Sequence, residues 1–367
     1  MTKIFRCVSL IVTCLILSAN LIFSASATSG IAEGILSVSH GGDAAEYEIN
    51  SEEAVLSAFS KGADFVSVNI RKNADGELIL CSENKTEISG IPLGEMLDKL
   101  SGDDVIILDF ADSLRDEIYS VVESKNAFSK AVLRINDSAG NIVKWLEDKN
   151  SNLQVIGVYD SFVVFTAVSH IKTLSKAGMP IVGYSSKNYF NEMFGSFVSK
   201  TLKADNMPKA MISTYDPDLC GQRSDSEDGW NDLIKKGYSV IETNNLDAFL
   251  RYVQSNKEIR SELENVFEKA KLIEADRYNT VSRENLLDSI ELAKVRLGTD
   301  KTSNDELQDS VSKLRLAMEN LALKTDEDTQ KGALNITVGK VIAAVVVGLA
   351  ILAAQIYTYK MQKRKKK

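Results

Sequence analysis

Histidine, proline and cysteine are scarce in this chain, and positive charge does not predominate. The 367 residues include 2 histidines, 4 prolines and 4 cysteines, and the formal net charge is −8. An acidic balance of this size argues against a nucleic-acid-binding surface. Few prolines, with 44% hydrophobic and 26% charged residues, indicate an ordinary folded protein with room for one large domain and something smaller. Any histidine-based acid–base chemistry in this chain is limited to His40 and His170.

The N-terminal segment has the composition of a secretion signal. Lys3 and Arg6 precede an apolar run that extends to Phe23, and Ala25-Ser26-Ala27 suits signal peptidase. We interpret residues 1–27 as a cleaved signal. A retained N-terminal anchor is the alternative, although a spanning helix usually needs about 20 apolar residues.

Residues 28–255 alternate strand-like runs with helical runs. This alternation indicates parallel strands joined by crossover helices, and eight such units close into a barrel. A doubly wound open sheet is the alternative, because alternation alone does not separate the two. The predicted strands are Leu36–His40, Phe65–Ile70, Val105–Phe110, Ala131–Ile135, Leu153–Tyr159, Ile181–Tyr184, Ala210–Tyr215 and Ser239–Thr243.

The stretch from Gly62 to Asn84 is the most informative part of this region. Two runs, Phe65–Ile70 and Leu78–Cys81, flank the turn-like Asn73-Ala74-Asp75-Gly76, so we expect strand, turn and strand. The stretch resembles the signature of glycerophosphodiester phosphodiesterases, G-A-D-x-I-E-x-D-V-x-x-T-x-D-G-x-x-V-V-x-H-D. Further similar positions are Ser39-His40-Gly41-Gly42 for H-R-G, Ile107 to Ala111 for I-E-x-K, and Gly237 to Asn245 for the pattern of the last strand. The resemblance implies a TIM-type (β/α)8 barrel.

The chemical groups of that family are mostly replaced. The family reaction, as the resemblance implies it, uses two histidines as acid and base around a phosphodiester and a divalent cation held by carboxylates. His40 stands at one histidine position and Asp109 at the third-strand glutamate. The remaining family positions carry Ser67 for a metal-binding Glu, Asn69 for a metal-binding Asp, Ser82 for the second His, Gly41 for the Arg of H-R-G and Ala111 for the Lys after the third strand.

These replacements define the predicted site. We expect His40 to be a vestigial catalytic residue, Asn69 and Asp109 to be candidate substrate-binding residues, and no metal site to remain. His170 falls in the helical stretch 162–176, where we expect a half-exposed structural residue. On this interpretation no cofactor is needed. The smallest change with a chance of rebuilding the family site combines Ser67→Glu, Asn69→Asp, Ser82→His and Gly41→Arg.

Two further features are expected at the strand-end face, and each also has an interpretation without a functional role. Cys81 and Cys220 are the only cysteines after the predicted signal. They either form a disulfide across the barrel mouth or remain two unpaired thiols. The polar segment from Asp216 to Asp228 is either a binding loop over the mouth or a solvated connection.

Residues 256–325 change to a charged, helix-forming composition. Three apolar stripes step by four and three residues, and Ser303 with Glu306 forms a capping-box sequence before the last of them. We therefore predict an antiparallel three-helix bundle that folds independently of the barrel. It resembles small helical modules of bacterial surface proteins, which serve as spacers or as glycan-binding units. The stripes are Ile259, Leu263, Val266, Ala270 and Ile273, then Leu286, Ile290, Ala293 and Leu297, then Leu307, Val311, Leu314, Met318 and Leu321.

The C-terminus has the pattern of a membrane anchor. A polar linker (326–335) precedes residues 336–359, which offer about 20 apolar residues for a transmembrane helix. The basic tail (360–367) places the C-terminus in the cytoplasm. A buried soluble helix is the alternative, but such a helix is not usually followed by five consecutive basic residues.

Taken together, the sequence predicts an extracellular barrel of the glycerophosphodiester phosphodiesterase type, followed by a helical bundle and anchored in the cell membrane. One hypothesis is a non-catalytic module that binds a glycerophosphodiester or another cell-surface ligand. The other is an active phosphodiester or headgroup hydrolase with a reorganised site centred on His40 and Asp109, which would need Ca²⁺ or Mg²⁺. The oligomeric state is not indicated by the sequence.

Overall fold

The computed structural model describes residues 34–81, 89–161, 164–184, 198–199, 201–203, 207–215 and 224–324. The predicted signal, linker, spanning helix and basic tail lie outside these residues, as do Ser82 and Cys220. Within the described part of the chain, no helix is long and apolar enough to cross a membrane.

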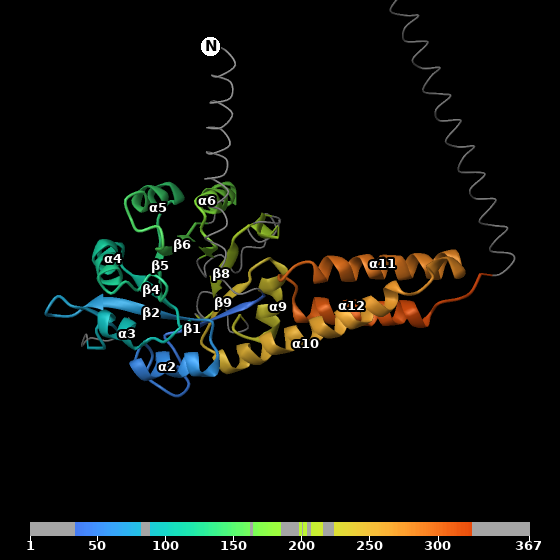
Figure 1. The fold of residues 1–367 in the computed structure, drawn as a ribbon, viewed down its shortest axis with the longest axis horizontal. Helices are drawn as coiled ribbons and strands as arrows, with labels where there is room; N and C mark the ends of the chain where they lie inside the picture. The colour runs from blue at the N-terminus through green and yellow to red at the C-terminus, as the bar shows by residue number, and fades with distance from the viewer. Residues whose placement is uncertain are drawn as a thin grey trace, which may run out of the picture. The chain divides into compact units, whose positions relative to one another are not determined.

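Eight parallel strands form a closed barrel (Figure 1). Strand β1 pairs with β9 on one side and with β2 on the other, so the sheet closes and the open-sheet alternative is excluded. The predicted barrel is therefore confirmed. The barrel strands are β1 (Leu36–His40), β2 (Phe65–Lys72), β4 (Ile106–Phe110), β5 (Ala131–Ile135), β6 (Gln154–Tyr159), β7 (Ile181–Tyr184), β8 (Lys209–Ser213) and β9 (Val240–Thr243).

The predicted strand-turn-strand unit is also present. Strand β3 (Leu78–Leu80) pairs antiparallel with β2, with Ile70 opposite Leu80. The Asn73 side-chain oxygen accepts hydrogen bonds from the backbone N–H groups of Asp75 at 3.1 Å and Glu77 at 2.8 Å, which fixes the turn.

Helices between the strands lie on the outside of the barrel (Figure 1). Their buried apolar residues form one core cluster with the outward-facing residues of the strands. Helix α2 shows why they form: Ser51 accepts a hydrogen bond from Ala54 N at 3.1 Å as the N-cap, and Gly62 ends the helix in the left-handed conformation. The described helices of this part are α2 (Glu52–Lys61), α3 (Leu93–Lys99), the 3-10 turn η1 (Asp112–Leu114), α4 (Arg115–Ser124), α5 (Ala139–Leu146), α6 (Val164–Lys176) and α9 (Glu227–Lys235).

The barrel interior has an apolar layer that follows from strand alternation. Successive side chains in a strand point to opposite faces, so every second residue faces the interior. The residues of this layer are Leu36, Val38, Phe65, Ile107, Val132, Ile156, Ile181, Met211 and Val240, all buried. They fill the interior below the carboxyl ends of the strands, which leaves the next inward-facing residues to form a second layer.

The chain continues into three helices: α10 (Leu246–Lys271), α11 (Thr280–Leu297) and α12 (Asn304–Glu319), with a 3-10 turn η3 (Ala275–Arg277) between α10 and α11. The capping box is confirmed, because Glu306 N donates to Ser303 Oγ and Ser303 N donates to Glu306 Oε2 at 3.1 Å. Many of the predicted stripe positions are buried: Leu263, Val266, Ala270, Leu286, Ala293, Leu307, Val311 and Leu314. Their assembly into an independent bundle stays a prediction.

The chain divides into two compact units. Of the described residues, one unit holds those through Arg260 together with Gly298–Leu307, and the other holds Ser261–Leu297 with residues 308–324. Within the first unit, Asp300 forms an ion pair with Lys209 at the start of β8 and accepts a hydrogen bond from Gly34 N at 3.3 Å. The turn before α12 thus belongs with the amino-terminal end of the barrel.

Candidate functional site

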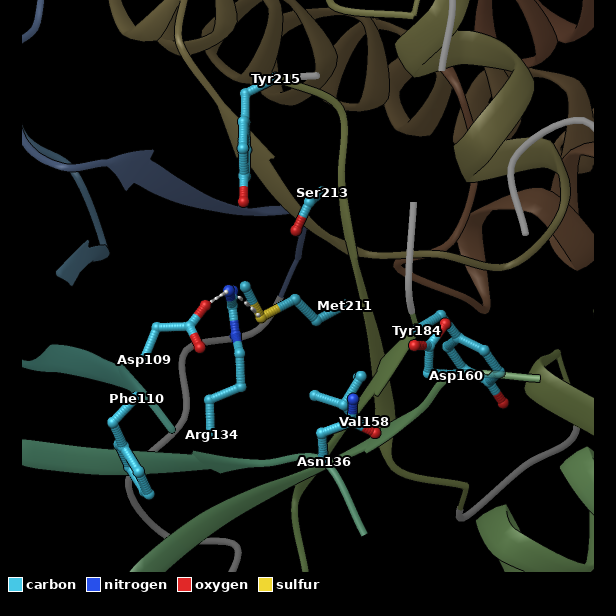
Figure 2. Close-up of a pocket in the computed structure, with 11 residues that line it drawn as sticks. Asp109, Phe110, Arg134, Asn136, Val158, Asp160, Tyr184, Met211, Ser213 and Tyr215 are labelled. Carbon is cyan, nitrogen blue, oxygen red and sulfur yellow. Dashed lines mark hydrogen bonds and ion pairs between the residues drawn. The ribbon is translucent and has the colours of Figure 1, made fainter. Parts of the chain in front are cut away.

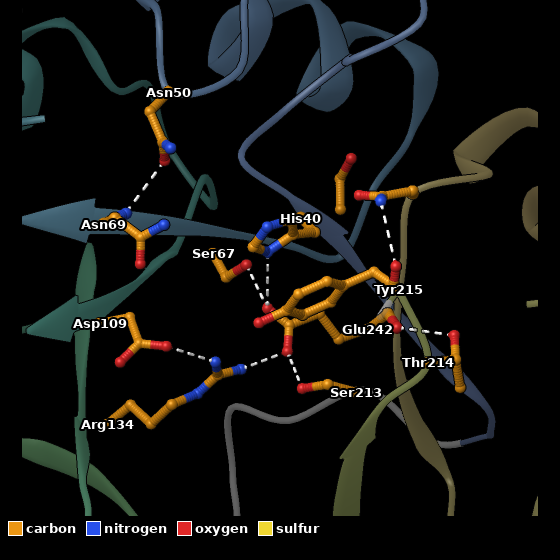
Figure 3. Close-up of polar contacts among 12 residues, drawn as sticks. His40, Asn50, Ser67, Asn69, Asp109, Arg134, Ser213, Thr214, Tyr215 and Glu242 are labelled. Atoms are coloured by element: carbon orange, nitrogen blue, oxygen red, sulfur yellow. Dashed lines mark hydrogen bonds and ion pairs between the residues drawn. The ribbon is translucent and has the colours of Figure 1, made fainter. Parts of the chain in front are cut away.

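A polar layer lies directly above the apolar layer, at the carboxyl ends of the strands (Figure 3). Each member except Asn69 follows an apolar-layer residue by two positions, as Asp109 follows Ile107 and Glu242 follows Val240, and Asn69 lies two positions after Ser67 on β2. Catalytic and binding groups of (β/α)8 barrels lie at this end. The residues of this layer are His40, Ser67, Asn69, Asp109, Arg134, Ser213 and Glu242.

Strand register brings the three predicted site residues together on adjacent strands. His40 on β1 lies opposite Ser67 on β2, and Asn69 on β2 lies opposite Asp109 on β4. The backbone N–H of Asn69 donates to Asn50 Oδ1 at 2.9 Å, which ties β2 to the loop after β1. The structure therefore places the predicted residues at one site, although their contacts run mainly to residues that the sequence did not single out.

Glu242 on β9 is the first of these unpredicted residues. Its side chain is fully buried and accepts hydrogen bonds from Ser67, Ser213 and Arg134, the last at 2.7 Å, and its Oε1 lies 3.4 Å from His40 Nδ1. Burial alone would raise the pKa of Glu242, but the Arg134 guanidinium and His40 outweigh it and hold the pKa well below its usual range. Glu242 is accordingly a buried carboxylate that is ionised at neutral pH.

Arg134 on β5 is the second unpredicted residue and the centre of the layer. Its Nη1 lies 2.8 Å from Asp109 Oδ2 and its Nη2 lies 2.7 Å from Glu242 Oε2, so one guanidinium joins two carboxylates (Figure 3). Burial disfavours the charged guanidinium, but Glu242 and Asp109 outweigh burial and raise the pKa of Arg134 above its usual value. Only one tenth of its side chain is exposed.

His40 is the sole histidine of the layer. Its ring stacks on Tyr215, with ring centroids 3.6 Å apart and planes 9° from parallel. The ring therefore lies between an aromatic partner and the Glu242 carboxylate, which fixes its position. His170, by contrast, lies on α6 with its Nε2 3.3 Å from the carbonyl oxygen of Gly157. The expectation that His170 is half-exposed is wrong: it is buried, and burial lowers its pKa.

Gly41, at the position of the arginine in the H-R-G pattern, has a backbone conformation and surroundings that disfavour a side chain. Its φ is +66°, and a Cβ added there would lie 2.0 Å from Ile49 Cγ1. Gly41→Arg would therefore require both backbone strain and the displacement of Ile49. The predicted four-residue reconstruction therefore meets a steric obstacle at Gly41, and it leaves Arg134 in place.

The remaining predicted positions are only partly described. Cys81 follows β3 and is buried, whereas Cys220 lies outside the described residues, so their pairing stays a prediction. Most of the polar segment 216–228 and Ser82 also lie outside the described residues.

The resemblance implies a divalent cation, and the carboxylates of the layer do not fit one. Asp109 and Glu242 are already joined by Arg134, and a cation placed between them would meet a guanidinium. Ser67, at the position of a metal-binding Glu, donates its hydroxyl to Glu242. Mg²⁺ and Ca²⁺ usually rely on several anionic oxygens. Among the described residues, no group of three or more His, Cys, Asp or Glu side chains is arranged to hold a metal ion.

A cavity of about 190 Å³ opens above Arg134 (Figure 2). It is lined by Asp109, Phe110, Arg134, Asn136, Val158, Asp160, Gly183, Tyr184, Met211, Ser213 and Tyr215. A second cavity of about 470 Å³ lies between the ends of β5 and β6 and helices α5 and α6, and it shares Asn136, Val158 and Asp160 with the first. The ion-paired layer thus forms the floor of an accessible pocket.

Comparison with known proteins gives likenesses among solved structures only. No family model and no curated protein sequence matches the chain. A glycerophosphoryl diester phosphodiesterase from Parabacteroides distasonis is 17% identical, with 59% of this chain and 85% of that chain covered and a TM-score of 0.45. A glycerophosphodiester phosphodiesterase from Thermotoga maritima is 14% identical over 60% of this chain and 99% of that chain, with a TM-score of 0.44.

A third similar structure is a phosphodiesterase from Oleispira antarctica in complex with the product sn-glycerol-3-phosphate. It is 9% identical, covers 57% of this chain and 93% of that chain, and has a TM-score of 0.41. The family named from the sequence motifs is thus the family of these structures. With TM-scores below 0.5, the superpositions are too loose to transfer the role of any residue, and the site rests on its own contacts.

Proposed function

We propose that this chain is a membrane-anchored extracellular protein whose glycerophosphodiester phosphodiesterase-like barrel binds a ligand without hydrolysing it. The observation that carries the proposal is the position of Arg134, which joins Asp109 and Glu242 at the floor of the pocket. The carboxylates that could take part in chemistry are committed to an internal ion pair.

The acid–base groups support the same proposal. Hydrolysis of a phosphodiester needs one group to remove a proton from the nucleophile and another to protonate the leaving oxygen, and each contributes about 10²- to 10⁴-fold in rate. His40 is the only histidine among the residues of the polar layer, and Glu242 is held ionised beside it. An ionised carboxylate fixed by Arg134 has no proton to give. The layer therefore supplies one histidine, His40, and no second acid–base group to match it.

The pocket itself remains, which supports binding rather than a purely structural role. Asp109, Asn136 and Asp160 line a cavity at the end of the barrel where ligands bind in this architecture. A ligand there would contact fixed polar groups, because the ion pairs hold Arg134 and Asp109 in place.

Anchoring is proposed from the sequence. A signal at residues 1–27 and a span at residues 336–359 would leave the barrel outside the cell and residues 360–367 inside. Protease added to intact cells is expected to remove the barrel, and complete protection would contradict this topology.

The direct test of the proposed function is hydrolysis by the full chain, purified in detergent. Glycerophosphodiesters are supplied with Mg²⁺ or Ca²⁺, and release of glycerol phosphate is measured beside an active enzyme of the similar family. We expect release at the level of the protein-free control and no change on His40→Ala. Turnover that depends on the cation and is abolished by His40→Ala would show that the barrel is an active hydrolase.

A further inference from the structure

The charges around the pocket alternate in sign. Arg134 lies between the carboxylates of Asp109 and Glu242, and Asp160 lines the same cavity (Figure 2). Among the described lining residues of both cavities, Arg134 is the only Lys or Arg. Two carboxylates thus pair with one guanidinium, and a third carboxylate, Asp160, lies elsewhere on the cavity wall.

An anionic ligand is disfavoured by this arrangement. A phosphate that approached Arg134 would also approach the carboxylate of Asp109, and like charges at contact distance repel strongly where water is partly excluded. The two hydrogen bonds that Arg134 gives to carboxylates also neutralise most of the attraction that it could offer. As far as the chain is described, the floor of the pocket therefore offers no cation that is not already paired with carboxylates.

A cationic ligand is also a poor match. An ammonium group has donors and no acceptor, whereas Arg134 still has N–H groups beyond those that bind Asp109, Glu242 and Met211. These N–H groups need acceptors when a ligand displaces water from the cavity. An ammonium in the cavity would face donors on Arg134 and would leave them unsatisfied.

A neutral polyhydroxylated molecule satisfies both kinds of group. Each hydroxyl donates one hydrogen bond and accepts others, so neighbouring hydroxyls can donate to Asp109 and accept from Arg134. Within the described residues, no donor binds Asp109 Oδ1, and the exposed Asn136 amide offers a donor and an acceptor at the rim. The adjoining second cavity is lined in part by the hydroxyl side chains of Ser138, Thr166, Ser169 and Thr173, so the polar surface continues beyond the first cavity.

We propose that the pocket binds a neutral sugar or polyol through Asp109, Arg134 and Asn136, without a metal ion. The inference rests on the proposed function, because the barrel must bind its ligand without hydrolysing a phosphodiester. It departs from the phosphodiester ligand that the sequence motifs suggest. In the complex, the fixed Arg134 guanidinium donates hydrogen bonds to neutral oxygens of the ligand.

The test measures binding to the full chain in a detergent that has no sugar headgroup, with EDTA present. Saturation-transfer NMR is used with glucose, N-acetylglucosamine, myo-inositol and glycerol as neutral probes, and with sn-glycerol 3-phosphate and choline as charged comparators. We expect saturable binding of at least one neutral probe and weaker binding of both charged comparators.

Variants locate the binding. Asp109→Asn keeps the shape of the side chain and leaves Arg134 paired with Glu242, and Asn136→Ala removes an exposed amide, so both variants should fold. Each variant is expected to weaken the affinity for the neutral probe about tenfold, equivalent to about 1.4 kcal/mol. Asp98→Asn is the matched control, because Asp98 also pairs with a cation, Lys125, but on the exposed surface of α3 and α4. It should leave binding unchanged.

Three results would overturn the inference: tighter binding of sn-glycerol 3-phosphate or choline than of every neutral probe, no binding of any neutral probe at millimolar concentration, or binding that Asp109→Asn and Asn136→Ala leave intact. Tighter binding of sn-glycerol 3-phosphate without turnover of its diesters would remove this inference and leave the proposed function standing. Turnover in the hydrolysis assay would remove the proposed function itself.

Discussion

The apolar and polar layers of the barrel interior come from the same strands, two residues apart. The apolar layer is held by burial and shape, so each of its members contributes largely by itself. The polar layer is held by charge pairing, because Glu242 depends on Arg134 and Arg134 depends on both Glu242 and Asp109. Neighbouring positions on one strand can thus differ in whether a substitution acts alone or through its partners.

The largest effect is expected from Arg134→Met. This change leaves Glu242 buried without a compensating charge, and breaking a buried pair from one side costs about 3–5 kcal/mol of unfolding free energy. Urea unfolding followed by tryptophan fluorescence measures it, because Trp145 and Trp230 both lie in the unit that contains the barrel.

A triple variant separates charge from packing in that result. Arg134→Met combined with Glu242→Gln and Asp109→Asn removes all three charges, and we expect it to recover most of the lost stability. If the triple variant is as unstable as Arg134→Met alone, the guanidinium acts through its volume and the charge-pairing account of the layer is wrong.

A smaller effect is expected from Glu242→Gln, with a defined pH dependence. The folded-state pKa of Glu242 lies below its ordinary value of 4.5, so its ionised form stabilises the fold above about that pH and the contribution is lost as the pH falls. At neutral pH the variant should be less stable by about 2 kcal/mol, because hydrogen bonds to a charged group are weakened.

The difference between wild type and Glu242→Gln should narrow as the pH is lowered below 4.5. Chemical denaturation at a series of pH values measures this difference directly. A gap that stays constant in acid would mean that Glu242 is not ionised in the folded protein.

The smallest effect is expected in the apolar layer, from Ile107→Val. Removal of one buried methylene costs about 1 kcal/mol, through lost burial and a small cavity. Because Ile107 has no charge partner, its effect should add to that of Glu242→Gln in the double variant. A coupling as large as either single effect would show that the two layers do not act separately.

The sequence predicted the barrel because its information is local and periodic. Each strand is a short run of aliphatic residues bounded by turns, as in Ile181–Tyr184, and the motif from Gly62 to Asn84 marks the second strand and its hairpin. Strand ends differ from the prediction by a residue or two, as at Val105 and Tyr215, because pairing with the neighbouring strand decides where a strand stops.

The site was predicted less completely because its key contacts are not local. Arg134 and Glu242 are 108 residues apart, and no motif joins them. A signal was available: each is the only charged residue in an otherwise apolar or small-residue strand, and each stands two positions after an inward-facing residue. Comparison with a family motif identifies positions where the expected groups are missing. It does not identify residues outside the motif, such as Arg134, that contact those positions.

The contact between the segment Gly298–Leu307 and the barrel was also not predicted from the sequence pattern. The periodic apolar residues predicted only the helices on either side of this segment. They do not report the ion pair between Asp300 and Lys209, which joins residues 91 positions apart. Helical stripes report which face is buried and not which element covers it.

The central claim is that Arg134 serves as the cation of the polar layer, so that Asp109 and Glu242 do not bind a metal ion. The most direct measurement is a titration of the full chain with Mn²⁺, in which electron paramagnetic resonance counts the free ion, for wild type and for Asp109→Asn. The account predicts no saturable site that Asp109→Asn removes. A stoichiometric site present in the wild type, lost in Asp109→Asn and retained in Asp98→Asn would contradict it.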